Sequence, residues 1–243
     1  MKDIRLIALD MDGTLLSSDH TVSEQNKEAI KKAREKGVEV IISTGRHFRT
    51  SAHIAKELDI HYIINVNGSE IWTMEEELIA REIVDASIIK KLIELKNKHK
   101  TWAWSASTDQ IWRDEFPDNV EDYTWLKFGF DTDNDETKQL LMATLEEWKE
   151  IELSNSSLTN IEVNAVGVNK AKAVEVVCER LGITMDQVMA CGDSLNDIKM
   201  IEQAGIGVAM GNAQDKVKEA SDWITTSNDE AGVAQAINKF VLK

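Results

Sequence analysis

Short apolar runs of strand length alternate with segments of helical periodicity toward both ends of the chain. The runs that predict strands are Ile4–Leu9, Val38–Ile42, Tyr62–Val66, Gln187–Ala190, Ile206–Ala209 and Trp223–Thr225. The segments that predict helices are Ser23–Lys36, Phe48–Leu58, Ala171–Leu181 and Ile198–Gln203. Continuous apolar strands that alternate with helices are typical of a parallel sheet covered on both faces. We therefore predict an α/β fold with a doubly wound parallel sheet, whose ligands bind beyond the carboxyl ends of the strands.

The middle of the chain follows a different order. Its predicted elements are a helix over Ala86–Lys100, strands over Trp102–Ser107, Ile111–Arg113 and Trp125–Phe130, a helix over Glu136–Lys149, and strands over Ile151–Asn155 and Ile161–Asn164. This order is typical of an antiparallel α+β domain rather than of alternating strands and helices. We therefore predict that residues 84–164 form a second domain, inserted into a first domain made of residues 1–83 and 165–243.

The charge balance argues against a nucleic-acid or anionic-membrane partner. The chain of 243 residues carries 28 Lys and Arg against 43 Asp and Glu, a net charge of −15, and no separate basic cluster. It has no uncharged apolar stretch of about 18 residues, and its start lacks the apolar segment of a secretory signal. Cys178 and Cys191 are too few for a disulfide framework. We expect a cytoplasmic monomer or homodimer.

Two carboxylates mark the end of the first predicted strand. Asp10 falls where the strand leaves the sheet, and Asp12 follows it in the loop before Gly13. A calcium loop is excluded, because its glycine and glutamate positions hold Leu15 and Thr21. A plain turn accounts for Gly13 but not for a carboxylate that ends a buried strand. The two acids would repel each other unless a cation lay between them, which predicts Mg²⁺ and a metal-assisted carboxylate nucleophile.

Cations stand at the start of two predicted helices, where the helix dipole disfavours them. The second strand is followed by Thr44, which offers a hydroxyl, and then by Arg46, His47 and Arg49. Lys170 lies in the first turn of another predicted helix. A bound anion would reconcile these cations with the helix dipole, whereas the alternative is that they are solvated surface charges. Because the feature occurs twice, we favour the anion.

A further carboxylate, Asp193, ends another apolar strand. The next residues, Ser194 and Asp197, stand three apart and match a capping box of the following helix. The capping box explains this pair without any function, but it leaves Asp193 without a structural reason. We therefore interpret Asp193 as a further metal-facing carboxylate. Metal and phosphate chemistry is common to all four strand ends.

In combination these residues resemble the haloacid dehalogenase superfamily of phosphohydrolases. The segments that match its four motifs in order are Asp10–Thr14 (DMDGT), Ile42–Arg46 (ISTGR), Lys170 and Gly192–Asp197 (GDSLND). Asn67–Gly68 and Val208–Ala213 are similar to signatures of the Cof-type branch. The resemblance implies a Rossmann-like catalytic core, and it implies that the insert is an αβ cap of the C2B type that determines substrate specificity.

The resemblance also implies a mechanism: hydrolysis of small phosphorylated metabolites, such as sugar phosphates or phosphorylated cofactors, through an aspartyl-phosphate on Asp10. Asp12 would protonate the leaving alkoxide and then activate water. Mg²⁺ would be held by Asp10, the backbone carbonyl of Asp12, and Asp193. The residues implied to bind the phosphate or the rest of the substrate are Thr44, Gly45, Arg46, Asn67, Lys170 and Asn196. Those implied to support the site are Gly13, Asp197 and Asn212.

The insert holds five of the seven tryptophans. Trp102 and Trp104 are two residues apart on a predicted strand and therefore share a face. They could form a stacking platform for a ring of the substrate, but aromatic side chains more often pack than bind, so we favour the core of the insert. The segment Asp109–Glu136 carries ten acids against two cations, Arg113 and Lys127. It is either a solvated acidic face or an overhang that disfavours strongly anionic substrates.

Two other functions would use similar residues. A phosphomutase would return the phosphoryl group to its substrate, and a receiver-type signalling module would hold it without turnover. The second acid, Asp12, and the insert argue against the signalling module. A P-loop kinase is disfavoured, because its glycine-rich string does not occur. The sequence leaves the identity of the phosphomonoester substrate open.

Overall fold

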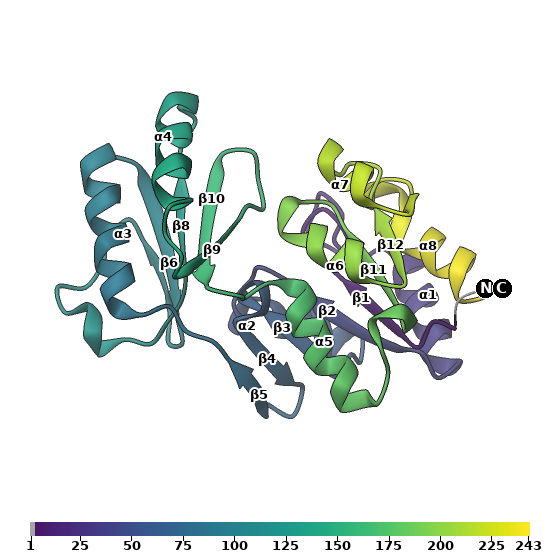
Figure 1. The fold of residues 1–243 in the computed structure, drawn as a ribbon. Coiled ribbons are helices and arrows are strands. Elements are labelled where there is room, and N and C mark those ends of the chain that lie inside the picture. Colours follow the sequence, from purple (N-terminus) through teal and green to yellow (C-terminus); the bar gives the residue numbers. More distant parts are fainter. Residues whose placement is uncertain (1–2) are drawn as a thin grey trace.

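The computed structural model describes residues 3–243, and its larger sheet contains eight strands (Figure 1). Their spatial order is β13-β12-β11-β1-β2-β3-β4-β5. Their bounds are β1 (Leu6–Leu9), β2 (Glu39–Ser43), β3 (Tyr62–Asn65), β4 (Glu70–Thr73), β5 (Leu78–Arg81), β11 (Val188–Gly192), β12 (Ile206–Ala209) and β13 (Trp223–Ile224). All pairs from β13 to β3 are parallel, which confirms the predicted parallel sheet.

Helices cover both faces of this sheet. Their bounds are α1 (Glu24–Glu35), α2 (Phe48–Glu57), α5 (Lys170–Leu181), α6 (Ile198–Gln203), α7 (Asp215–Ala220) and α8 (Gly232–Phe240). Alternate residues of β1 point to opposite faces, so Leu9 packs in the same cluster as Ile30 of α1, and Leu6 packs with Val174 of α5. The sheet is therefore buried on both sides, as its continuous apolar strands require.

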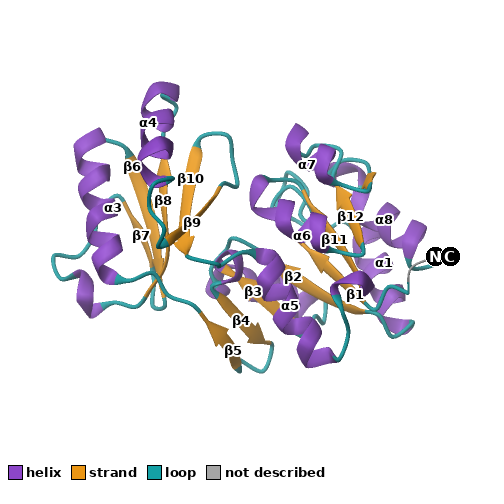
Figure 2. Ribbon diagram, viewed as in Figure 1, coloured by secondary structure: helices purple, strands orange, loops and turns teal. Residues whose placement is uncertain are grey.

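The middle of the chain forms a separate antiparallel sheet with two helices (Figure 2). The elements are α3 (Ala86–His99), β6 (Trp102–Ser107), β7 (Ile111–Arg113), β8 (Trp125–Asp131), α4 (Asp135–Leu145), β9 (Ile151–Ser154) and β10 (Asn160–Ala165), with sheet order β7-β6-β8-β10-β9. Ile89 of α3 and Leu141 of α4 pack with Phe128 and Val163 on one face of this sheet. We refer to this unit as the cap; its limits at residues 84 and 164 stay a proposal.

The sequence interpretation missed several elements. Strands β4 and β5 extend the large sheet as an antiparallel hairpin beyond β3, and helices α7 and α8 complete the carboxyl-terminal part. Helix α4 is also shorter than predicted and ends at Leu145. The short 3₁₀ helices are η1 (Val66–Gly68), η2 (Val120–Asp122), η3 (Met185–Gln187), η4 (Leu195–Asp197) and η5 (Asn228–Glu230). No helix within residues 3–243 has the length and apolar character to cross a membrane.

Candidate active site

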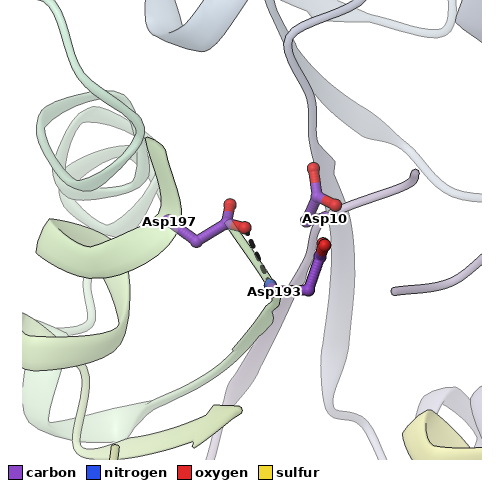
Figure 3. Close-up of side chains that lie close together, drawn as sticks. All are labelled: Asp10, Asp193 and Asp197. Carbon is purple, nitrogen blue, oxygen red and sulfur yellow. Dashed lines mark hydrogen bonds between the residues drawn. The ribbon is translucent and has the colours of Figure 1, made fainter. Parts of the chain in front are cut away.

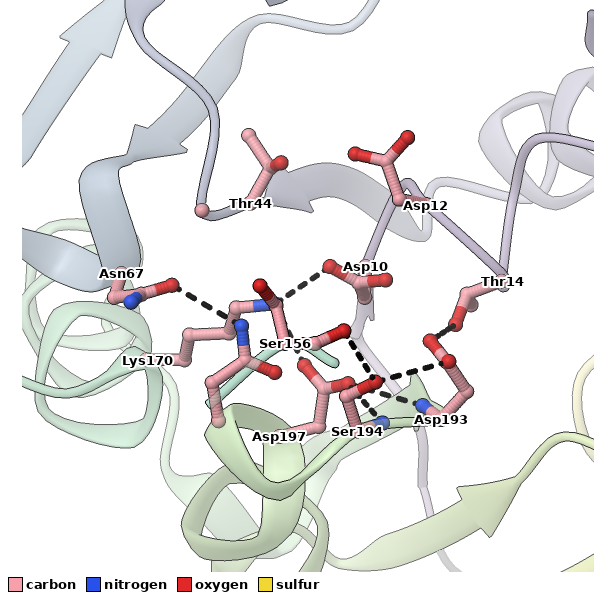
Figure 4. A network of polar contacts seen from close by, with 12 residues as sticks. Asp10, Asp12, Thr14, Thr44, Asn67, Ser156, Lys170, Asp193, Ser194 and Asp197 are labelled. Carbon is pink, nitrogen blue, oxygen red and sulfur yellow. Dashed lines mark hydrogen bonds and ion pairs between the residues drawn. The ribbon is translucent and has the colours of Figure 1, made fainter. Parts of the chain in front are cut away.

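The predicted site residues lie at the carboxyl ends of the central strands, where parallel strands deliver their loops to one edge. Asp10 follows β1, Thr44 follows β2, Asn67 lies in η1 after β3, and Asp193 follows β11. Figure 4 shows these side chains around one centre. Asp10 and Thr44 are buried, as is Asn67. Residues far apart in the sequence therefore meet because the topology places their strand ends side by side.

Lys170 is fully buried and forms two ion pairs with strand-end carboxylates. Its Nζ lies 2.6 Å from Oδ1 of Asp10 and 2.6 Å from Oδ1 of Asp197. Burial by itself would lower the pKa of the Lys170 ammonium, but the two carboxylates outweigh it and raise this pKa above its usual range. Asn169 is the N-cap of α5 and accepts a hydrogen bond from the backbone N–H of Lys172. The protein's own acids therefore offset the unfavourable position of Lys170 at the helix start.

Asp197 both caps its helix and pairs with Lys170. Its Oδ2 accepts hydrogen bonds from the backbone N–H groups of Asp193 and Ser194, each at 3.0 Å, so the predicted capping box is confirmed. Both carboxylate oxygens of Asp197 are thus occupied by protein donors. Asp193 instead accepts from the Thr14 hydroxyl at 3.0 Å and the Ser194 hydroxyl at 3.1 Å. The roles of Asp193 and Asp197 are therefore different.

Carboxylate oxygens of Asp10, Asp193 and Asp197 lie within 4.8 Å of one another (Figure 3). Burial raises the pKa of Asp10 well above its usual value, with Lys170 opposing this shift. Burial, together with the charge of Asp197, raises the pKa of Asp193 to about 6. Oxygen donors that are costly to ionise without a positive partner fit a hard divalent cation. Asp197 is held by the Lys170 ammonium and by two backbone N–H groups. Oδ2 of Asp10 accepts no hydrogen bond from the described residues, and Asp193 accepts only from two hydroxyl groups, so Asp10 and Asp193 are the more available ligands.

Gly13 allows Asp193 to approach the loop after β1. Its φ is +79°, and a Cβ at this position would lie 2.6 Å from Oδ2 of Asp193. We expect Gly13→Ala to raise the Mg²⁺ concentration needed for half-maximal activity by about tenfold, because the methyl group displaces this carboxylate, and to cost about 1–3 kcal/mol through backbone strain.

Gly37→Ala is the matched control for Gly13→Ala. Gly37 has a φ of +80°, but its Cβ would meet no atom within 4 Å. Gly37→Ala should therefore lower the free energy of unfolding through backbone strain alone, as measured by urea denaturation. Its Mg²⁺ requirement should equal that of the wild type. Equal Mg²⁺ requirements in the two variants would contradict the role given to Gly13.

Arg46 forms a forked ion pair with Asp12. Its Nε and Nη2 donate to the two carboxylate oxygens of Asp12 at 2.7 and 2.5 Å. The Thr44 hydroxyl accepts from the Arg46 backbone N–H at 3.1 Å, and the next residue, His47, caps α2 through Nδ1. Burial lowers the pKa of His47, so this cap is neutral. Arg46 thus has a structural partner beside the predicted anion, and His47 is a helix cap rather than a cation.

A strained turn after β3 carries Asn67 toward the cap. Val66, Asn67 and Gly68 all have positive φ angles, which is unusual for a β-branched residue such as Val66. The backbone N–H of Val66 donates to the carbonyl of Arg46 and that of Asn67 to the carbonyl of Thr44, each at 3.0 Å. These two bonds join the loops after β2 and β3.

Asn67 joins the core to the cap. Its Nδ2 donates to Oε2 of Glu162 on β10 at 2.6 Å, and its Oδ1 accepts from Asn196 at 3.2 Å. Oδ1 of Asn196 is buried without a partner among the described residues. The backbone carbonyl of Gly45 accepts a hydrogen bond from Lys127 at 3.1 Å. The side-chain Nδ2 of Asn212 donates to the backbone carbonyl of Gly13 at 2.8 Å.

The cap contributes a buried ion pair that sequence reasoning missed. Nζ of Lys127 lies 3.2 Å from Oε1 of Glu162, and both side chains are almost fully buried. Glu162 also accepts from Ser156 at 2.9 Å. Burial lowers the pKa of the Lys127 ammonium. Burial by itself would raise the pKa of Glu162, but the charge of Lys127 and the hydrogen bonds from Asn67 and Ser156 outweigh it and lower this pKa below its usual value. A lysine inside the apolar strand WLKFGF was the available signal.

A cavity of about 230 Å³ lies between the core and the cap. Its walls are formed by Asp10, Asp12, Gly45, Arg46, Trp104, Lys127, Ser156, Glu162, Ser194 and Asn196. None of the ten acids of segment 109–136 lines this cavity among the described residues, which favours the solvated acidic face over the overhang. Thr44, Asn67 and Lys170 stand behind this wall and are bonded to its residues.

The interpretation that Trp102 and Trp104 pack in the core of the insert is wrong. Trp125 is buried in the cap core, and Trp112 and Trp148 pack against it. Trp102 and Trp104 belong to none of the apolar clusters of the described residues; Trp102 is 44% exposed and Trp104 lines the cavity. The face of β6 that carries them is turned away from α3 and α4.

Comparison with known proteins agrees with this geometry. The haloacid dehalogenase-like hydrolase family matches residues 7–119 and 113–237. The 5-amino-6-(5-phospho-D-ribitylamino)uracil phosphatase YcsE of Bacillus subtilis is 51% identical over 241 residues, which cover 99% of this chain and 97% of that protein. Two haloacid dehalogenase-like hydrolases of known structure are also similar. The one from B. subtilis has a TM-score of 0.90 at 25% identity and covers 98% of this chain and 100% of its own. The one from Bacteroides thetaiotaomicron has a TM-score of 0.82 at 29% identity, with coverages of 97% and 99%.

The chain therefore belongs to the haloacid dehalogenase-like hydrolase family. Within this family it is a Cof-type phosphatase, an enzyme that hydrolyses phosphoric monoesters. The motifs and the αβ cap expected from the sequence agree with this assignment.

Proposed function

We propose that this enzyme is an Mg²⁺-dependent phosphatase that works through a phosphoryl group carried on Asp10. The single observation that supports this most is the environment of that carboxylate. Its Oδ1 is held by Lys170 at 2.6 Å, while its Oδ2 accepts no hydrogen bond from the described residues. A buried carboxylate with one fixed and one free oxygen is oriented for attack on phosphorus.

In the proposed first step, Oδ2 of Asp10 forms a bond to phosphorus while the bond between phosphorus and the ester oxygen breaks. Asp12 gives a proton to the leaving oxygen, and it later takes a proton from the water that attacks the aspartyl-phosphate and releases phosphate. Arg46 must release one Asp12 oxygen before that oxygen carries the proton, because the guanidinium now contacts both. The arriving phosphate is a suitable competitor for this arginine.

The remaining residues stabilise charge. Lys170 is placed beside Asp10, where negative charge gathers on the phosphoryl oxygens, and the Thr44 hydroxyl can donate to the same group. Asp10, Asp193 and the Asp12 carbonyl would hold Mg²⁺, which supplies charge neutralisation for the phosphate. Asn196, with its unpartnered Oδ1, is available to a metal-bound water. Gly45 and Asn67 position the wall around the substrate, and Asp197 positions Lys170.

We propose 5-amino-6-(5-phospho-D-ribitylamino)uracil as the substrate. The relative that carries this name as a phosphatase is 51% identical along nearly the whole of both chains. The test is phosphate release by the purified protein, with Mg²⁺, from this compound and from a panel of sugar phosphates and phosphorylated cofactors. We expect the highest kcat/KM for the named compound. Formation of an isomerised ester instead of free phosphate would favour the phosphomutase alternative.

Stabilisation by Mg²⁺ should depend on pH. The pKa of Asp193 is about 6 in the folded, metal-free protein, above its usual value of about 3.9. Between these values the native state holds a proton that the unfolded chain has lost, so the free energy of unfolding falls as pH rises through this window. A cation binds only the carboxylate form. We therefore expect Mg²⁺ to raise Tm more at about pH 7.5 than at about pH 5.

Thermal unfolding with Mg²⁺ and with EDTA at the two pH values measures this effect. Asp193→Asn is the control variant, because its amide does not titrate, and its Mg²⁺-dependent shift should be small at both values. An equal Mg²⁺ shift at both pH values in the wild type would contradict the proposed ligand.

A further inference from the structure

A second cavity of about 350 Å³ adjoins the catalytic one at the junction of cap and core. The two cavities share Gly45, Arg46 and Trp104 as wall residues. The cap side of the second cavity is formed by five residues, which we call the outer groove: Trp102, Trp104, Ala106, Ile111 and Arg113. Its volume is within the range of sites that bind small organic ligands.

The outer groove occupies the face of the cap sheet that no helix covers. Residues 102, 104 and 106 alternate with Ala103, which packs in the cap core with α3 and α4. On the neighbouring strand, Arg113 is the direct cross-strand partner of Trp104, and Ile111 that of Ala106. Exposed aromatic surface beside a catalytic cavity indicates a binding face.

Gly129 allows the Trp104 indole to lie flat over the sheet. Gly129 is the cross-strand partner of Trp104 on β8, and a Cβ at this position would lie 2.4 Å from an indole carbon. The Lys127 ammonium stands 4.6 Å from the centre of the same ring. The Trp104 indole is therefore held in place by its contacts with Gly129 and with the buried Lys127 ammonium. It lines both the catalytic cavity and the second cavity.

Arg113 is the cation of the outer groove, and its guanidinium forms no hydrogen bond or ion pair with any described residue. Arg113 is one of two cations in the acidic segment 109–136. The other cation, Lys127, is buried and paired with Glu162. A free guanidinium next to exposed indoles offers forked donors for carbonyl oxygens and a planar surface for stacking. Lys127 and Glu162 by contrast already share their polar atoms with protein groups.

We infer that the outer groove binds the ring end of the substrate: a planar, carbonyl-bearing heterocycle that stacks on Trp102 and Trp104 and accepts hydrogen bonds from Arg113. The phosphate then lies at Asp10, and the linker between ring and phosphate passes Arg46 and Trp104, which border both cavities. This inference rests on the proposed function, and it assigns specificity to residues that take no part in the chemical step. The substrate class is a phosphomonoester joined by a flexible chain to such a ring.

The experiment compares two esters that differ in the ring. These are 5-amino-6-(5-phospho-D-ribitylamino)uracil and D-ribitol 5-phosphate, which has the same phosphorylated chain without the heterocycle. The variants are Trp102→Ala, whose side chain is 44% exposed, and Arg113→Met. Leu140→Ala on α4, which is 52% exposed on the other side of the cap, and Lys98→Met on α3 are the matched controls.

We expect the wild type to prefer the ring-bearing ester. The ratio of the two kcat/KM values should fall about tenfold in Trp102→Ala and in Arg113→Met, mostly through KM, as for the loss of one stacking contact. The two controls should keep the wild-type ratio. A wild-type ratio retained by both groove variants would overturn the inference, while phosphate release from the ring-bearing ester would leave the proposed function intact. A wild type that hydrolyses other phosphomonoesters but not the ring-bearing ester would overturn the proposed substrate and the ring site together.

Discussion

Asp10→Asn should reduce phosphate release by at least about a thousandfold, because an amide cannot act as the attacking nucleophile. The fold should persist. The amide side chain has nearly the same volume as the carboxylate it replaces, and Lys170 keeps its second partner, Asp197, at 2.6 Å. Steady-state phosphate release under saturating Mg²⁺ measures the activity, and circular dichroism with thermal unfolding measures the fold.

The matched control for this change is Asp59→Asn. Asp59 is an exposed aspartate whose carboxylate pairs with Arg34, and its φ of +54° is one that asparagine accepts readily. This variant should retain wild-type turnover. Near-normal turnover in Asp10→Asn would remove Asp10 from the nucleophile role and, with it, the proposed aspartyl-phosphate.

Lys170→Met should lose both activity and stability. The substitution removes the shared partner of Asp10 and Asp197 and leaves their charges buried and uncompensated, a loss of about 3–5 kcal/mol in the free energy of unfolding. The same change removes the cation beside the attacking carboxylate, so turnover should fall by about a hundredfold or more. Urea denaturation in EDTA and a phosphate-release assay measure the two effects.

The stability loss of Lys170→Met should depend on pH. Burial already raises the pKa of Asp10, and without the ammonium this carboxyl takes up a proton more readily. The native variant then binds protons that the unfolded chain lacks above about pH 5, so its free energy of unfolding should rise as pH falls from about 8 to about 5.5. Lys172→Met, an exposed lysine two residues further along α5, is the control and should change neither quantity. A variant with wild-type stability at high pH would contradict the ion-pair account.

Much of the core fold could be predicted, because each of its strands carries its own pattern. The run from Leu6 to Leu9 is buried at every position, and helix α1 begins directly after Ser23, the first residue of its predicted segment. The hairpin of β4 and β5 was missed because Leu78–Arg81 is largely exposed or half-buried and has no continuous apolar run. Strand β5 pairs with β4, and β4 in turn pairs with β3. The hairpin therefore depends on contacts with the rest of the sheet, which the local sequence pattern does not show.

The sequence alone determined which side chains follow the strands of the parallel sheet: Asp10 and Asp12, Thr44 and Asp193. The physical reason is that a parallel sheet brings all its carboxyl ends to one edge, whatever the details of packing. Only the tertiary structure decided the pairings among these groups. The position of Arg46 in the sequence did not predict the ion pair between its guanidinium and Asp12. The spacing of Ser194 and Asp197 predicted a helix cap, but it did not predict that Asp197 also pairs with Lys170.

The role of the cap was likewise decided only by tertiary structure. Trp104 lies on β6, Lys127 on β8 and Glu162 on β10. The sequence alone does not say which face of this antiparallel sheet is turned toward the catalytic core. That choice follows from packing: Phe128 and Phe130 pack in the same core as α3 and α4 on one face, so side chains on the opposite face, such as Trp104 and Lys127, line the catalytic cavity. Local periodicity thus fixed the strands of the cap, while contacts between distant segments fixed which of its surfaces lines the cavity.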